Sequence, residues 1–153
     1  MPDVVLTRPA AALSLAELVT EAQRLQQAGQ AEAAVALYRD FIVEGPRAMN
    51  RSAEAEAAYR QAVALQPNFP HARLNLGHQL ERSGRHDAAM AQWRAVIDSA
   101  AAADMQVHAW NNLGRLLETL RRYPEAEAAL RASLLLDPTQ PNVVQHYVHL
   151  RQK

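Results

Sequence analysis

The sequence predicts an all-α protein, a solenoid of about seven to eight helices arranged as antiparallel hairpins. Composition is one reason: 49% of the 153 residues are hydrophobic but only 5% are aromatic, so Ala and Leu supply most of the apolar content. Small and unbranched residues of this kind favour closely packed helices. The other reason is a short sequence motif that recurs along the chain, which is typical of stacked repeats.

The chain contains four copies of this motif. Ala53–Arg60 and Pro124–Arg131 are nearly identical, and they begin 71 residues apart. That distance is about two repeats, and a third copy, His86–Arg94, lies between them. A fourth copy, Ala31–Arg39, precedes the others. The period is therefore about 34 to 36 residues.

The copies resemble the tetratricopeptide repeat, in which a first helix A carries Trp, Leu-Gly and Tyr, and a second helix B carries Ala, an aromatic residue and a closing Pro. The resemblance implies a right-handed superhelix that binds other proteins. The last copy matches at Trp110, Leu113, Gly114, Leu117, Tyr123, Ala126, Leu130 and Pro138. The copy before it matches at Leu76, Gly77, Leu80, Gly84, Ala89 and Trp93.

Small residues mark the places where helix A and helix B of one hairpin cross. Gly77 is expected to face Ala89, and Gly114 to face Ala126, because two backbones approach closely only where side chains are minimal. Leu residues at helical spacing then fill the flanks of each crossing. Trp93 and Trp110 occupy packing positions, so the pattern favours core residues over a platform on which a ligand stacks.

The spacing of the helix B alanines shows an irregularity. Ala34, Ala55, Ala89 and Ala126 are separated by 21, 34 and 37 residues, so the first interval is one helix too short. Gly45-Pro46 predicts a break there. A helix A is therefore expected to be missing near residues 45–51, with helices 31–44 and 52–66 forming a hairpin. The three extra residues of the last interval are expected to extend helix B of the third copy by a turn.

These observations predict how the chain is divided. Residues 1–13 are expected to form a flexible segment, and residues 14–138 the solenoid, which is irregular over 14–67 and regular over 70–103 and 107–138. Residues 139–153 form either a capping helix or the start of an unfinished repeat. The missing helix is expected to leave apolar surface near the N-terminus, which a second copy covers in a homodimer; the alternative is a monomer that tolerates the irregularity.

The helix A residues outside the core pattern are expected to line a concave groove that holds a protein or an extended peptide. Asn75 and Asn112 occupy the same repeat position, and an Asn side chain can pair with the amides of any peptide. Carboxylate-clamp repeats need Lys and Arg in these positions, so a clamp on a peptide C-terminus is less favoured. The predicted groove residues are His71, Asn75, His78, Arg82, His108, Asn111, Asn112 and Arg115.

Two hypotheses for function follow. The first is a non-catalytic scaffold for protein interactions. The second comes from a further resemblance, because Asn75 and Asn112 look like the asparagine ladder of O-linked N-acetylglucosamine transferases. The helix over 141–153 also looks like the junction to the catalytic region in their bacterial, Spindly-like relatives. That resemblance implies a substrate-recognition arm whose catalytic part lies outside this chain.

Other classes of function are disfavoured. Lys plus Arg equals Asp plus Glu at 16 each, which leaves no basic excess for nucleic acid or anionic lipid. There is no Cys, no secretory signal and no long apolar stretch, so a cytoplasmic protein without a membrane partner is expected. His71 with His78, and His146 with His149, lack a third ligand nearby in sequence. No catalytic motif is present, so neither enzymatic activity, metal nor cofactor is expected.

Overall fold

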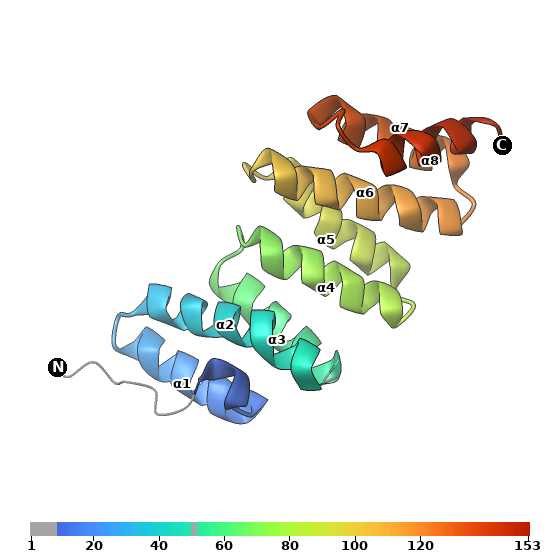
Figure 1. Cartoon of the computed structure of the whole chain (residues 1–153). Coiled ribbons are helices and arrows are strands. Elements are labelled where there is room, and N and C mark those ends of the chain that lie inside the picture. Colours follow the sequence, from blue (N-terminus) through green and yellow to red (C-terminus); the bar gives the residue numbers. More distant parts are fainter. Residues whose placement is uncertain (1–8, 50–51) are drawn as a thin grey trace. The chain divides into compact units, whose positions relative to one another are not determined.

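A computed structural model describes residues 9–49 and 52–153 (Figure 1). Within these residues all regular structure is helical, and the chain divides into two compact units, residues 1–72 and 73–153. None of the described helices combines the length and apolar composition that a membrane crossing requires. The helices are η1 (Ala10–Ala12), α1 (Leu15–Gln27), α2 (Ala31–Met49), α3 (Ser52–Leu65), α4 (Pro70–Arg82), α5 (His86–Asp98), α6 (Ala103–Thr119), α7 (Tyr123–Leu136) and α8 (Pro141–Arg151).

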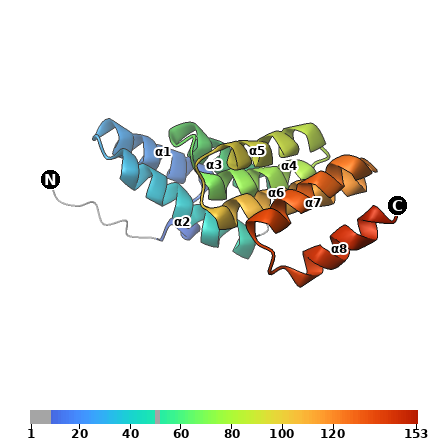
Figure 2. The same ribbon diagram turned by 90° about the horizontal axis from the view of Figure 1, so that it is seen from above.

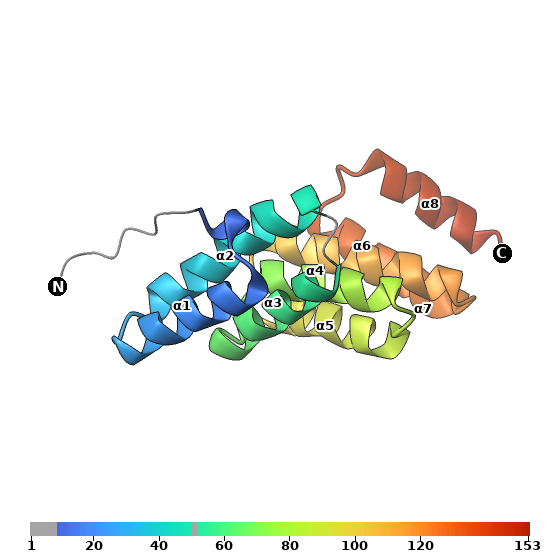
Figure 3. The same cartoon turned by 90° about the horizontal axis from the view of Figure 1, so that it is seen from below.

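The first unit packs α2 against both α1 and α3. Helix α1 starts with a capping box, in which the Ser14 hydroxyl accepts a hydrogen bond from the Glu17 amide and the Glu17 carboxylate accepts one from the Ser14 amide. Leu18, Ala22 and Leu25 recur at helical spacing and are buried. Figure 3 shows α1 and α2 side by side. Because α2 also packs against α3, the expected hairpin of these two helices is present.

Two expectations for the first unit were wrong. Helix α2 does not end at Glu44 but continues through Gly45 and Pro46 to Met49. The ring of proline fixes φ near a helical value, so a helix can continue through it with the loss of one hydrogen bond. Residues 10–13, which were expected to belong to a flexible segment over 1–13, instead pack against α2 through η1, with Ala10 and Leu13 buried. Residues 1–8 lie outside the described part of the chain.

The second unit is built from A helices α4 and α6, B helices α5 and α7, and the final helix α8 (Figures 1 and 2). The glycines lie at the crossings, as predicted. A Cβ atom on Gly77 would lie 2.2 Å from Trp93 Nε1, and one on Gly114 would lie 2.7 Å from Leu130 Cδ2. Trp93 is fully buried, which confirms its place in the core, whereas Trp110 is half-buried.

The extra residues before α6 do not lengthen α5, contrary to expectation. Helix α5 ends at Asp98, and α6 instead begins early, at Ala103. The hydroxyl of Ser99 donates to the carbonyl of Val96 at 2.7 Å and accepts from the amide of Ala101 at 3.2 Å. A side chain that bonds to nearby backbone in this way stabilises a turn over continued helix.

The turns after α1, α4 and α6 share one geometry. At the end of α4 the amide of Gly84 donates to Glu81 and that of Arg85 to Leu80, the bond pattern of a Schellman motif, with Gly84 at φ +78°. Gly29 has the same role after α1, at φ +76°. After α6 the equivalent residue is Arg121, at φ 59°. Only this turn places a side chain in the left-handed region among the described residues.

Gly77→Ala is expected to lower the free energy of unfolding by about 1–3 kcal/mol, because its new methyl group overlaps the ring of Trp93. Without that overlap the same change would stabilise helix α4, since Ala has the higher helix propensity. Urea denaturation followed by circular dichroism measures the difference. A Gly77→Ala protein more stable than the parent would contradict the close crossing.

Arg121→Gly is expected to raise the free energy of unfolding by about 0.5–1 kcal/mol, because glycine adopts positive φ without steric strain. Gly84→Ala is the matched opposite change and is expected to destabilise by a similar amount. Both are read as shifts of the melting temperature. Equal melting temperatures for Arg121→Gly and the parent would show that the left-handed turn carries no strain.

Candidate functional site on helices α4 and α6

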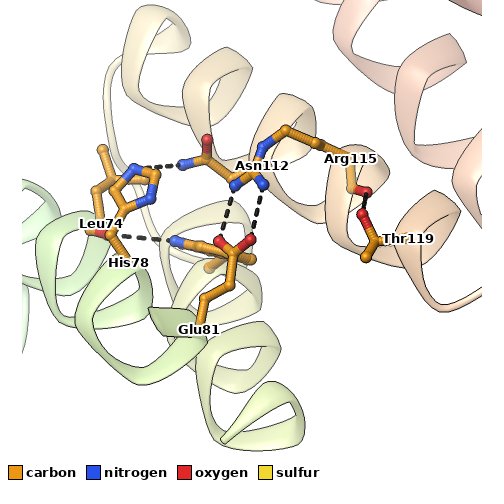
Figure 4. Close-up of polar contacts among 7 residues, drawn as sticks. Leu74, His78, Glu81, Asn112, Arg115 and Thr119 are labelled. Carbon is orange, nitrogen blue, oxygen red and sulfur yellow. Dashed lines mark hydrogen bonds and ion pairs between the residues drawn. The ribbon is translucent and has the colours of Figure 1, made fainter. Parts of the chain in front are cut away.

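Helices α4 and α6 are joined by polar side chains that lie one repeat apart in the sequence. The Nδ2 atom of Asn112 lies 3.4 Å from Nε2 of His78, and both residues are half-buried. One helical turn further, Arg115 bonds to Glu81 (Figure 4). Each pair spans 34 residues, whereas equivalent positions of α4 and α6 lie 37 residues apart, so each bond joins a residue of α4 to a position about one turn earlier in α6. We call Asn75, His78, Glu81, Asn112 and Arg115 the polar face.

The Arg115–Glu81 pair is bidentate. Both guanidinium nitrogens, Nη1 and Nη2, donate to the two carboxylate oxygens at 2.7 Å. The hydrogen bonds from Arg115 hold the pKa of Glu81 below its ordinary value, and those to Glu81 raise the pKa of Arg115. Two parallel bonds fix the geometry of the pair, although the arginine side chain is partly open to solvent. The polar face thus neutralises its own charges.

His78 connects the polar face to the core. Its ring meets the edge of the Trp93 ring at a centroid distance of 5.7 Å and an interplanar angle of 68°. Trp93 in turn donates from Nε1 to the carbonyl of Leu74 at 3.2 Å. Burial lowers the pKa of His78; Arg115 and His108 also lower it, and Glu81 acts in the opposite direction. The neutral imidazole therefore accepts the hydrogen bond from Asn112 through Nε2.

Asn111, a predicted groove residue, is used differently. Its Nδ2 atom donates to Oε1 of Gln140 at 2.8 Å. Gln140 also donates to the carbonyl of Asp137 at 2.8 Å and to the buried hydroxyl of Ser133 at 3.1 Å. Asn111 therefore holds the start of α8 and stands apart from the pairs on the polar face. Its Oδ1 atom is buried without a hydrogen-bond partner among the described residues.

The remaining predicted groove residues take no part in the hydrogen bonds of the polar face. Asn75 is half-buried and makes no side-chain hydrogen bond within the described chain, whereas His71, Arg82 and His108 are exposed. Leu74, on the same helix as His71 and Asn75, is buried because it belongs to the core beside Trp93. The structure therefore brings together three of the predicted residues: His78, Asn112 and Arg115.

A second carboxylate contact was not predicted. The Nε2 atom of His146 on α8 contacts Oε2 of Glu118 on α6, although 28 residues separate them. The sequence shows no acidic residue near His146, so inspection of nearby positions could not find this partner. No group of three metal-ligating side chains occurs in the described chain. The contact therefore serves to dock α8 on α6.

Acidification is expected to destabilise the second unit through His78. Because the folded-state pKa lies below the ordinary value of 6.5, the neutral ring stabilises the fold fully above pH 6.5, and this contribution is lost as the pH falls through the lowered pKa. His78→Gln should flatten the dependence of the melting temperature on pH below 6.5. His149→Gln, at an exposed site on α8, is the control and should leave that dependence unchanged. An unchanged slope in His78→Gln would contradict the burial of a neutral ring.

Comparison with known proteins agrees with the repeat pattern. The family model described as tetratricopeptide repeat matches residues 47–104 and 80–141. A cellulose synthase operon protein C of Pseudomonas fluorescens (strain SBW25) is 33% identical over 134 residues, which cover 82% of this chain. The chain spans only 10% of the length of that relative.

Solved structures show the same fold at low sequence identity. PilF of Pseudomonas aeruginosa has a TM-score of 0.62 and 18% identity, with 89% of this chain and 67% of PilF covered. A thermophilic tetratricopeptide repeat protein of Thermus thermophilus has a TM-score of 0.59 and 16% identity, covering 94% of this chain and 74% of the other. MamA from Desulfovibrio magneticus RS-1 has a TM-score of 0.58 and 19% identity, with 89% and 82% covered. The matched residues, the helical hairpins and these neighbours agree: the chain belongs to the tetratricopeptide repeat family.

Proposed function

We propose that this chain is a non-catalytic scaffold that binds an extended segment of another protein across the polar face. One observation carries the proposal: α4 and α6 present an Asn at the same repeat position, beside an ion pair that neutralises itself. Tetratricopeptide repeats are in general protein-interaction modules, and the family match points to no catalytic family.

The side-chain amides of the polar face have hydrogen-bonding groups that no described residue uses. Asn75 makes no side-chain hydrogen bond within the described chain, and Asn112 uses its amide nitrogen for His78, which leaves its carbonyl oxygen as an acceptor. A peptide backbone offers both donors and acceptors, so amide side chains can bind it whatever its sequence. The partner segment is therefore an extended one, held mainly through its backbone.

The ion pair argues against an acidic ligand. Arg115 is occupied by two hydrogen bonds to Glu81, so a peptide carboxylate would have to displace a partner that is already bidentate. Arg82 is exposed, but one arginine does not form a clamp. An uncharged or mixed segment is favoured over an acidic tail or a free C-terminus.

Three broader expectations from the sequence stay predictions. They are a cytoplasmic location, self-association near the N-terminus, and a role as the recognition arm of a glycosyltransferase. The last of these depends on Asn75 and Asn112, of which only Asn112 is joined to the neighbouring helix A, α4. The described side chains also give no large exposed hydrophobic residue in the first unit on which to base a dimer.

Replacing both Asn75 and Asn112 by Ala is expected to weaken binding of a partner several-fold while the protein stays folded. A pull-down with mass spectrometry first identifies the partner, and fluorescence polarisation with a labelled segment of it then gives the dissociation constant. Asp98→Ala, at the exposed end of α5, is the matched control because it lies on a B helix. Equal affinities for the parent and the double variant would refute binding through these amides.

A further inference from the structure

The contact between His78 and Asn112 gives the Asn112 amide a direction. Nδ2 of Asn112 lies 3.4 Å from Nε2 of His78, and Figure 4 shows the amide oxygen on the side away from the imidazole. No described residue bonds to this oxygen. A neutral imidazole has one donor and one acceptor nitrogen, so Nε2 accepts from the amide only in the tautomer that carries its proton on Nδ1. The tautomer of His78 and the orientation of Asn112 therefore determine each other.

The imidazole is held from the core side, whereas the amide is free to turn. The His78 ring meets the edge of the buried Trp93 ring at a centroid distance of 5.7 Å, and Trp93 is fixed by its hydrogen bond to the carbonyl of Leu74. A half-turn about the bond between Cβ and Cγ exchanges Nδ2 and Oδ1 of an asparagine with little change in shape. The imidazole therefore decides which of the two Asn112 atoms faces outward.

A positive charge on His78 reverses this choice. An imidazolium donates from both nitrogens, so its Nε2–H group would face a second donor if the Asn112 amide kept its orientation. After a half-turn, Oδ1 of Asn112 accepts from Nε2–H in a charge-assisted hydrogen bond, and the NH2 group faces outward instead. The outward group of Asn112 thus changes from an acceptor to a donor.

The groups that face His78 favour the neutral ring. Burial lowers the pKa of His78, and Arg115 and His108 on α6 lower it as well. Glu81, on the same helix as His78, acts in the opposite direction. The contact from α5 is Trp93, which is uncharged. The outward amide oxygen therefore persists below the ordinary histidine pKa of 6.5.

We propose that His78 is a positioning residue of the polar face, which turns the amide oxygen of Asn112 outward and so selects a backbone N–H group of the bound segment at this point. Protonation of His78 replaces this preference by one for a carbonyl group. The selection rests on the proposed function, because it needs a segment bound across the polar face, but the coupling of imidazole and amide does not. Asn75 makes no side-chain hydrogen bond within the described chain, so its amide adapts to either group.

The first measurement needs no ligand. Long-range proton–nitrogen correlation spectra of the isotope-labelled full chain distinguish a protonated from an unprotonated imidazole nitrogen. At a pH well above 6.5, His78 is expected to carry its proton on Nδ1 and to leave Nε2 unprotonated. A proton on Nε2 at that pH would overturn the proposal, because Nε2 would then donate to Asn112.

The second measurement follows the side-chain NH2 group of Asn112 as the pH falls. Nuclear Overhauser effects between its protons and the His78 ring are expected to disappear with the midpoint of the imidazole titration, and exchange of these protons with water should become faster. The side-chain amide of Asn111, which bonds to Gln140, is the internal control and should not follow that midpoint. Overhauser effects that persist when His78 is charged would refute the reversal of the amide.

Two variants separate positioning from a structural role. His78→Glu supplies an ionised group that only accepts hydrogen bonds, so it should keep the Asn112 NH2 group turned inward through the pH range in which the parent reverses. His78→Met is similar in size but supplies no comparable acceptor, so the NH2 protons of Asn112 should exchange faster with water at every pH. Slow exchange in His78→Met, equal to that of the parent, would show that the imidazole does not hold the amide.

The selection of an N–H group is tested with two uncharged, extended probe peptides. One is acetyl-Thr-Ala-Thr-Ala-Thr-Ala-Thr-amide. In the other, lactic acid replaces each alanine, so that ester oxygens replace the N–H groups of these residues. Above pH 6.5 the parent is expected to bind the first peptide about fivefold more tightly, the effect of about one hydrogen bond, as measured by NMR titration. His78→Met should show a smaller preference.

The outcomes with the two peptides separate this inference from the proposed function. Equal affinity of the parent for both peptides would overturn the selection of an N–H group. Binding of neither peptide would contradict the proposed function and the selection together, whereas the coupling of His78 to Asn112 is decided by the spectra of the free chain.

Discussion

The close crossing of A and B helices at Gly77 and Gly114 is the constraint on which the second unit depends. Because no side chain separates the backbones, the ring of Trp93 packs directly against α4 and is fully buried. A buried indole N–H needs an acceptor, and it finds one in the carbonyl of Leu74. The same ring packs against His78, so core packing lowers the pKa of this histidine and favours its neutral form.

The polar face joins repeats, in addition to the binding role that we propose for it. His78 contacts Asn112, and Glu81 contacts Arg115, so the successive A helices α4 and α6 are linked by side-chain bonds. These residues cannot be optimised for a ligand alone, since each also positions a neighbouring helix. The joining role explains why the face is polar but carries little free charge: the arginine that joins α6 to α4 is paired with a carboxylate.

Features that depend on local pattern or on period could be predicted from the sequence. The repeats, the glycine crossings and the burial of Trp93 all follow from spacing, and the structure confirms them. Errors arose where a single local signal was decisive, as at Gly45-Pro46, which lies inside α2, and before Ala103, where the Ser99 hydroxyl ends α5. The pairings within the site could not be predicted, because a periodic pattern tells which residues share a helix face but not which of them bond across 28 to 34 residues.

Helix α8 shows how one position can change the meaning of a repeat. Its inner side keeps the repeat pattern, with Leu150 buried 34 residues after Leu116, and so it packs as an A helix should. Its outer side replaces the crossing glycine by Val148, which closes the space that Trp93 and Leu130 use in the earlier hairpins. A helix cannot cross α8 there in the way that α5 crosses α4 unless its own side chain is small. The side-chain volume that the other crossings place on helix B is placed here on helix A.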